Sequence, residues 1–247
     1  ALRAAGPTGA YRRGREMHAT QTGYAALLHP PKVVPPRPER VAGILSHGGT
    51  VPGTTNRGDP FKLADPASPG VFHDASDRVV ENFRRLGFHV LVAVGGDGSL
   101  AMAHKLSQKG IPVVGVPKTI DNDLAGTVAT FGFDTAVTTA TEAIDKLHST
   151  AMAHERIMVV EVMGRYAGWI ALHSGVSGSA DAILIPEIPY DLGKVCARLT
   201  ENERRGKRYG IVVVAEGAVP VGGAMTTKGP AAAGRSDEEA YQVTFRR

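Results

Sequence analysis

Apolar residues follow two alternating patterns through the central part of the chain. In segments of the first kind they recur every three or four residues, which predicts helices over residues 75–86, 99–109, 134–154, 165–177 and 191–205. In segments of the second kind they form short continuous runs, which predict buried strands over residues 88–94, 111–116, 156–163, 181–185 and 210–215. Because strands and helices alternate, the pattern predicts an α/β fold with a mostly parallel sheet and helices on both faces.

The two ends of the chain lack this regularity. Residues 1–40 include a proline-rich run that is typical of a linker or loop. Residues 218–240 are rich in Gly, Ala and Pro. We therefore expect an irregular N-terminal segment over 1–40, an α/β core over 41–217, and a flexible tail or the start of a missing segment over 218–247.

Composition narrows the class of protein. The 247 residues carry 28 Lys and Arg against 24 Asp and Glu, and a net charge of +4 fits the binding of anionic phosphates. Outside residues 204–208 the basic residues are scattered and aromatics make up only 6%, so nucleic acid is not an expected partner.

Cys196 is the single cysteine, which excludes an internal disulfide, and we expect it on the buried side of a helix. With no apolar run near the length of a membrane span and no signal peptide, we expect a cytoplasmic protein without membrane contact.

The stretch Gly95-Gly96-Asp97-Gly98-Ser99 follows a predicted strand and precedes a predicted helix. A glycine-rich turn at a helix N-terminus exposes backbone N–H groups that suit phosphate, whereas the Asp97 carboxylate would repel it. A Mg²⁺ ion between carboxylate and phosphate removes that repulsion. The turn therefore favours metal-assisted phosphoryl transfer over simple dinucleotide binding.

A second polar stretch, Pro117-Lys118-Thr119-Ile120-Asp121-Asn122-Asp123, comes just past the next predicted strand. Both stretches would lie at the carboxyl ends of strands, where open α/β sheets bind ligands. In an extended loop Asp121 and Asp123 point the same way, so that one can act as a base while the other orients it or a metal. The alternative interpretation is a surface turn rich in Asp and Asn.

Five motifs, taken in order, resemble the 6-phosphofructokinase family from about Val41 to Gly217. They are Gly95-Gly96-Asp97-Gly98-Ser99, Pro117-Lys118-Thr119-Ile120-Asp121-Asn122-Asp123, Phe131-Gly132-Phe133-Asp134-Thr135-Ala136, Val160-Glu161-Val162-Met163-Gly164-Arg165-Tyr166-Ala167-Gly168 and Val214-Ala215-Glu216-Gly217. Thr-Ile-Asp-Asn-Asp together with Met-Gly-Arg is specific to that family, whereas NAD kinases and lipid kinases share Gly-Gly-Asp-Gly. The resemblance implies a phosphofructokinase-like, doubly wound, mostly parallel sheet with helices on both faces.

The resemblance also implies roles for the glycine turn and for the stretch that carries Asp121. Asp121 would be the general base toward the attacking sugar hydroxyl, with Asp123 beside it to orient it or a metal. Lys118 and Thr119 would contact the transferring phosphoryl group or the acceptor. The nucleotide would be held by Gly95, Gly96, Asp97, Gly98 and Ser99, with Asp97 as the Mg²⁺ partner.

Further roles carried over from the family concern residues elsewhere in the chain. Arg165, expected after a strand and at the start of a helix, would neutralise charge on the phosphoryl oxygens. Met163 and Gly164 would line the sugar pocket, and Glu216 would accept hydrogen bonds from sugar hydroxyls. Arg156 would bind the sugar phosphate of a neighbouring subunit, which implies a homo-oligomer, a dimer or tetramer. Finally, Arg57 would help to bind the phosphate donor.

The expected reaction is transfer of a phosphoryl group from ATP to the 1-hydroxyl of fructose 6-phosphate, which belongs to glycolysis. Gly98 leaves space for the third phosphate of ATP, and Lys118 is compatible with either ATP or pyrophosphate, so ATP with Mg²⁺ is the expected donor. A pyrophosphate-dependent enzyme is the alternative.

Two further alternatives remain open. The residues from Gly96 to Ala101 formally fit the G-x-G-x-x-A fingerprint of a nicotinamide dehydrogenase, although Asp97 would then face a pyrophosphate without a metal. The family's first Gly-Gly-Asp-x-Pro-Gly-x-Asn loop and its later Gly-His-x-Gln-Arg-Gly-Gly segment are not found in the sequence. We therefore expect a fragment, or a non-catalytic or incomplete subunit, as the third possibility.

Overall fold

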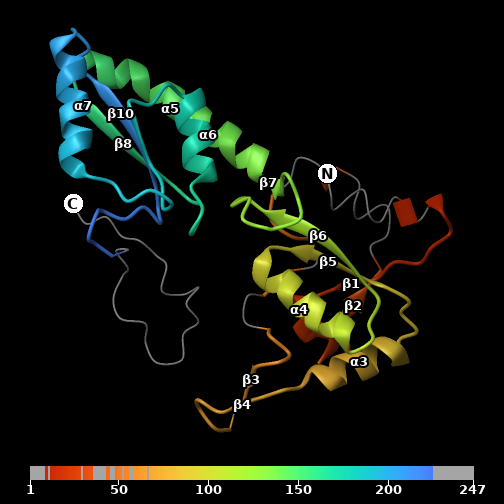
Figure 1. Ribbon diagram of the computed structural model, residues 1–247. Helices are drawn as coiled ribbons and strands as arrows, with labels where there is room; N and C mark the ends of the chain where they lie inside the picture. Colours follow the sequence, from red (N-terminus) through yellow and green to blue (C-terminus); the bar gives the residue numbers. More distant parts are fainter. Residues whose placement is uncertain are drawn as a thin grey trace. The chain divides into compact units, whose positions relative to one another are not determined.

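The computed structural model describes residues 9–10, 12–28, 30–35, 43–44, 48–51, 53–55, 58–65 and 67–224. The chain divides into two compact units (Figure 1). The first takes in Ala1–Ala93 and Ser99–Gly115, and the second takes in Val94–Gly98 and Val116–Arg247. The glycine turn up to Gly98 is therefore grouped with the stretch that carries Asp121.

The first unit combines short antiparallel pairs of strands with helices. Its strands pair antiparallel as β1 with β2 and as β3 with β4. Its elements are β1 (Ala19–Thr20), the 3₁₀ helix η1 (Gly23–Leu27), β2 (Val33–Val34), β3 (Leu63–Ala64), β4 (Phe72–His73), α3 (Ser76–Arg85) and most of α4 (Asp97–Gln108).

The core of the first unit forms where these elements meet. The apolar stripe expected on the helix over 75–86 is confirmed, since Val79, Val80 and Phe83 are all buried. They pack in one cluster with Leu27, Leu28, Leu106 and Ile111. The strand expected over 88–94 begins only at Leu91, because the Phe88 N–H bonds to the Phe83 carbonyl at 3.2 Å and closes the end of α3.

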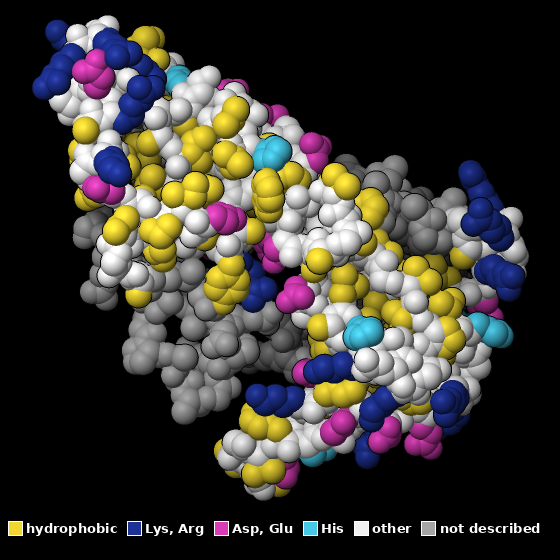
Figure 2. Space-filling model, viewed as in Figure 1, with side chains coloured by type: hydrophobic (Ala, Val, Ile, Leu, Met, Phe, Trp, Pro, Cys, Tyr) yellow, Lys and Arg dark blue, Asp and Glu magenta, His cyan; other side chains and the backbone are white. Residues whose placement is uncertain are grey.

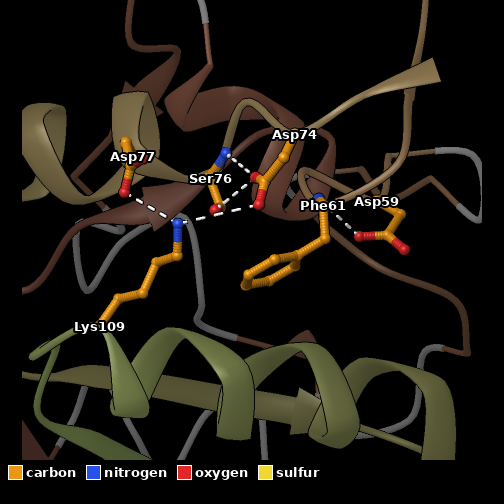
Figure 3. A network of polar contacts seen from close by, with 6 residues as sticks. All are labelled: Asp59, Phe61, Asp74, Ser76, Asp77 and Lys109. Atoms are coloured by element: carbon orange, nitrogen blue, oxygen red, sulfur yellow. Dashed lines mark hydrogen bonds and ion pairs between the residues drawn. The ribbon is translucent and has the colours of Figure 1, made fainter.

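The start of α3 is fixed by an aspartate outside the helix (Figure 3). One carboxylate oxygen of Asp74 accepts hydrogen bonds from the Ser76 N–H at 2.8 Å and from the Ser76 hydroxyl at 2.5 Å. Lys109, just past the end of α4, lies 2.8 Å from Asp77 and 3.8 Å from Asp74. These contacts satisfy a free N–H at the helix start and join α3 to the end of α4.

The strands β5 (Leu91–Gly95), β6 (Val113–Thr119) and β7 (Phe131–Gly132) form a sheet in that order. The strand expected over 111–116 runs on to Thr119, because Lys118 and Thr119 pair in parallel with Phe131 and Gly132. Lys118 and Thr119 therefore end a strand instead of lying in a loop. A two-residue partner such as β7 leaves no periodic signal in the sequence.

The two faces of β5 and β6 differ in exposure. Ala93 is buried, and Leu91 and Val113 on the same face pack against the first core cluster. Val92, Val94 and Val114 point the other way and are each about half exposed among the described residues. Among the described residues, the more buried face of these two strands is thus the one turned toward the first core cluster.

The second unit is a three-layer α/β arrangement. Its parallel sheet has the strand order β8, β10, β9. Its elements after β7 are α5 (Phe133–Ala153), β8 (Ile157–Val162), α6 (Trp169–Ser177), β9 (Ala182–Leu184), α7 (Leu192–Arg204) and β10 (Gly210–Ala215).

Alternation along β10 assigns the helices to the two faces of this sheet. Ile211, Val213 and Ala215 are buried in one cluster with Ile144 and Ala151 of α5 and Ala171 of α6. Gly210 points to the opposite face, where the Leu199 side chain of α7 lies so close that a Cβ on Gly210 would stand only 2.8 Å from it. The expected α/β fold with parallel strands between helices is confirmed here (Figure 1).

The first residues of the helices in the second unit differ in places from the predicted ones. Gly132, at φ +116°, is the cap of α5, and Asp134 lies in the first turn of the helix. Arg165 does not start a helix, because α6 begins at Trp169. Asp191 caps α7 by accepting the Gly193 N–H at 2.8 Å. Cys196 is exposed on α7 and not buried as expected, since none of the side chains of this helix is fully buried.

Lys and Arg side chains gather around the end of α7 (Figure 2). Arg205 pairs with Glu201 at 2.8 Å, Arg208 pairs with Glu155 at 3.2 Å, and Lys207 pairs with the buried carboxylate of Asp181 at 2.5 Å. Each of these cations therefore has an acidic partner in the protein. No helix in the described part of the chain is both long and apolar enough to cross a membrane.

Candidate active site

The glycine turn is short and lies between strand β5 and helix α4. Its residues up to Gly98 are grouped with the second unit. Gly95 ends β5, and Asp97 already belongs to the first turn of α4, two residues earlier than expected. A carboxylate is favoured at that place by the helix dipole. Gly96 packs beside Thr119, since a Cβ on Gly96 would lie 3.5 Å from the Thr119 Cβ. The turn and the end of β6 are therefore neighbours, and Asp97 and Gly98 remain exposed.

Asp121 is half-buried directly after β6. The Thr119 hydroxyl donates a hydrogen bond to its carboxylate at 3.1 Å, and the Asp121 N–H donates to the same hydroxyl oxygen at 3.2 Å. Burial raises the pKa of Asp121, and the charges of Asp123 and Glu216 also raise it, whereas the Thr119 hydrogen bond and the charge of Arg165 lower it. Side chains more than forty positions apart in the sequence thus act on one carboxylate.

The loop after Asp121 is closed by Asn122 and Thr130, to which the sequence analysis assigned no structural role. Asn122 has a left-handed backbone, with φ +56°, and its side-chain oxygen accepts the Thr130 N–H at 2.9 Å. The Thr130 hydroxyl donates to the Thr119 carbonyl at 2.9 Å, and Thr130 itself is buried. Asn tolerates this backbone better than most residues, which is the signal that was available in the sequence.

The loop between β8 and α6 carries Arg165. Gly164 and Arg165 both have positive φ angles, +144° and +51°. One carboxylate oxygen of Glu216 accepts the Gly164 N–H at 3.1 Å and the Arg165 N–H at 2.7 Å. Farther along, the Gly168 N–H donates to Glu187 at 2.8 Å. Two carboxylates from outside the loop thus bind its backbone.

The other expected site residues lie in varied settings. Lys118 at the end of β6, Asp123 and Met163 are exposed, and Arg156 is exposed just before β8. Ser99 belongs to the first unit, and its carbonyl accepts the hydroxyl of Tyr24 at 2.8 Å. Burial raises the pKa of Tyr24 to about 12. Arg57 lies outside the described residues.

A metal at this site would have few protein ligands. Among the described residues no group of three or more His, Cys, Asp or Glu side chains could hold an ion. Asp97 offers one exposed carboxylate at the start of α4. This donor set fits Mg²⁺, which commonly keeps water ligands and binds through one or two carboxylates together with substrate phosphates.

Comparisons with known proteins identify the family of the chain. A family model described as phosphofructokinase matches residues 1–243. The chain is 48% identical to ATP-dependent 6-phosphofructokinase 2 of Clostridium perfringens over 224 residues, which cover 90% of this chain and 61% of that protein. It is 50% identical to ATP-dependent 6-phosphofructokinase of Spirochaeta thermophila over 201 residues, which cover 80% of this chain and 52% of that protein. The chain thus spans between about half and 61% of these relatives' length.

Solved structures give the same result for the fold. The structure of phosphofructokinase from Saccharomyces cerevisiae matches with a TM-score of 0.73 and 30% identity, over 91% of this chain and 33% of that one. Pyrophosphate-dependent phosphofructokinase from Nitrosospira multiformis matches with a TM-score of 0.73 and 24% identity, over 90% of this chain and 58% of that one, and at this identity supports the fold alone. Since the family model matches nearly the whole chain and close relatives agree with it, the chain belongs to the phosphofructokinase family.

Proposed function

We propose that this protein transfers the terminal phosphoryl group of ATP to the 1-hydroxyl of fructose 6-phosphate, a glycolytic step that yields fructose 1,6-bisphosphate. The observation that carries the proposal is the setting of Asp121, a half-buried carboxylate bonded to Thr119 and subject to the charge of Arg165. The identity of 48–50% to proteins named ATP-dependent 6-phosphofructokinase supports this choice of reaction.

In the proposed reaction Asp121 takes the proton of the sugar 1-hydroxyl as that oxygen attacks the terminal phosphorus of ATP. The new O–P bond forms while the bond from that phosphorus to ADP breaks, so ADP leaves with the electron pair. Thr119 keeps the Asp121 carboxylate oriented through its hydrogen bond. Arg165 supplies positive charge for the phosphoryl oxygens in the transition state, where charge is spread over them.

The remaining residues are proposed to bind the two substrates. Backbone N–H groups of the glycine turn from Gly95 to Ser99 would receive the phosphates of ATP, and Arg57 would be a further ligand of ATP. Asp97 would hold Mg²⁺, which when bound neutralises charge on the phosphate oxygens. The sugar phosphate would be bound by Lys118, Asp123, Arg156, Met163, Gly164 and Glu216.

We also propose a cytoplasmic homo-oligomer, a dimer or tetramer, in which Arg156 completes the sugar-phosphate site of a neighbouring subunit. The exposure of Arg156 is compatible with that role. Measuring the mass in solution and the fructose 6-phosphate affinity of Arg156→Ala tests both points, because a monomer with unchanged affinity contradicts them.

The reaction is tested by assaying the wild type and Asp121→Asn with Mg²⁺, ATP and fructose 6-phosphate, with the sugar bisphosphate identified directly. Loss of the base should lower kcat by roughly 10²–10⁴-fold, while fructose 6-phosphate affinity changes little. Asn keeps a side-chain oxygen for Thr119, so the fold should remain. Glu155→Gln, at a surface ion pair, is the matched control and should behave as wild type.

Three outcomes would contradict the proposal. Near-normal kcat in Asp121→Asn excludes Asp121 as the base. Binding of both substrates by the wild type without turnover supports a non-catalytic subunit. Tight binding of NAD without Mg²⁺ supports the dehydrogenase alternative.

A further inference from the structure

The backbone around Arg165 is held in a conformation that an arginine does not favour. Arg165 has φ +51°, in the left-handed region where a Cβ crowds the following carbonyl oxygen. The preceding Gly164, at φ +144°, adopts a conformation open essentially to glycine. Such a pair persists only where surrounding contacts compensate for it, so the contacts that hold this backbone bear on how Arg165 is presented.

Glu216 provides the main contacts of this kind. A single oxygen of its carboxylate accepts both the Gly164 N–H and the Arg165 N–H, at 3.1 and 2.7 Å. A hydrogen bond to a charged acceptor is stronger than one between neutral groups. Glu216 is carried to this place by the sheet, because Ala215 pairs with Val162 and the Glu216 N–H donates to the Val162 carbonyl at 2.9 Å.

The neighbour of Glu216 packs against the same backbone. A Cβ on Gly217 would collide with the carbonyl oxygen of Arg165, so only glycine allows the end of β10 to come this close. The Ala167 N–H donates to the Gly164 carbonyl at 2.9 Å and closes the turn from within. Glu216 and Gly217 therefore fix Arg165 from one side while the turn fixes it from the other.

On the function proposed above, we infer that Glu216 is a positioning residue, which fixes the backbone of Gly164 and Arg165 so that the Arg165 guanidinium meets the transferring phosphoryl group. This role is additional to the sugar contact proposed above. The oxygen that receives the two N–H groups is occupied by the protein itself. The effect of that oxygen on kcat therefore passes through Arg165.

The first arm of the test measures backbone amide exchange at Gly164 and Arg165 in the whole protein, without substrate. Glu216→Ala removes the acceptor and should speed exchange of these two amides by roughly tenfold or more. Glu216→Gln keeps an acceptor oxygen at the same reach and should show a much smaller change. If the alanine variant does not fold, Glu216→Asp, which keeps the charge but is too short, should show the faster exchange. Glu155→Gln is the surface control.

The second arm measures kcat for Glu216→Ala, Arg165→Ala and the double variant. If Glu216 acts through Arg165, the double variant should lose no more kcat than Arg165→Ala alone, within about twofold. Glu216→Gln should recover most of the kcat that the alanine variant loses.

Each arm can overturn the inference separately. Unchanged exchange at Gly164 and Arg165 in Glu216→Ala overturns it, whatever the reaction. Independent, multiplying losses of kcat, or a loss of fructose 6-phosphate affinity with kcat unchanged, also overturn it and leave Glu216 with the sugar contact alone. A wild type that does not phosphorylate fructose 6-phosphate refutes the proposed function, and the exchange arm then decides whether Glu216 holds the loop.

Discussion

Asp121 shows how one residue depends on its surroundings. Burial is the largest cause of its raised pKa, and Glu216 and Arg165 shift that pKa in opposite directions. A general base must be ionised to accept a proton, so its activity is lost as the pH falls through its pKa. The acid limb of the proposed reaction should therefore lie above the ordinary range for aspartate.

Two substitutions should move this acid limb in opposite directions. Glu216→Gln removes a negative neighbour and should lower the pKa of Asp121, whereas Arg165→Ala removes a positive one and should raise it. The pH dependence of kcat/KM, which reports the free enzyme, measures both shifts. Shifts of the same sign in the two variants would mean that another group sets the limb.

Gly98 governs the choice of phosphate donor at the residue scale. It is exposed in the first turn of α4, where a side chain would stand among the N–H groups proposed to receive ATP. Gly98→Asp adds bulk and negative charge, so kcat/KM for ATP should fall strongly, by about tenfold or more, and that for pyrophosphate should fall less. The alternative Gly98→Ala, with bulk but no charge, separates the two causes. A wild-type preference for pyrophosphate would contradict the argument.

At the scale of elements, helix starts depend on single side chains. The two hydrogen bonds from Ser76 hold the pKa of Asp74 below its usual range, which indicates that they favour the ionised carboxylate. Asp74→Ala should destabilise the first unit by about 1 kcal/mol, and Asp74→Asn should cost less because Asn accepts the same N–H. Asp77→Ala, which removes a surface ion pair with Lys109 and an exposed carboxylate from the first turn of α3, should have a smaller effect. Urea unfolding midpoints measure the order, and an equal loss in Asp77→Ala would contradict it.

At the scale of the whole molecule, the described residues form two buried clusters. Phe83 belongs to the cluster of the first unit and Ile144 to that of the second. Each unit is stabilised by its own buried cluster. A cavity in one cluster should therefore destabilise that unit before the other. Periodicity in the sequence reports local elements and not which of them cluster together, so the assignment of elements to the two units comes from the structure.

Ile144→Ala should destabilise the second unit by about 2–5 kcal/mol, and Phe83→Ala should destabilise the first by about 3–5 kcal/mol. Hydrogen exchange followed along the chain should rise after Ile144→Ala in α5, α6 and β10 and not in α3. Phe83→Ala should give the reverse pattern. Equal rises in both units after either change would indicate a single cooperative unit.

The sequence by itself determined the family, the alternation of strands and helices, and the two motifs around Asp97 and Asp121. Each of these features depends on residues that are contiguous in the sequence, so local spacing and residue chemistry were enough to predict it. Asp97 and Asp121 each follow the strand that was expected before them, within a few residues.

Only the tertiary structure decided how distant segments meet. Pairing with β7 extends β6 as far as Thr119. The carboxylate of Glu216 accepts the Arg165 N–H and holds Arg165 in a left-handed turn where periodicity predicted a helix. Neither contact can be read from neighbouring residues, because each partner lies between about ten and fifty positions away in the chain. The free energy that favours these local conformations comes from hydrogen bonds and packing that exist only once the sheet has formed.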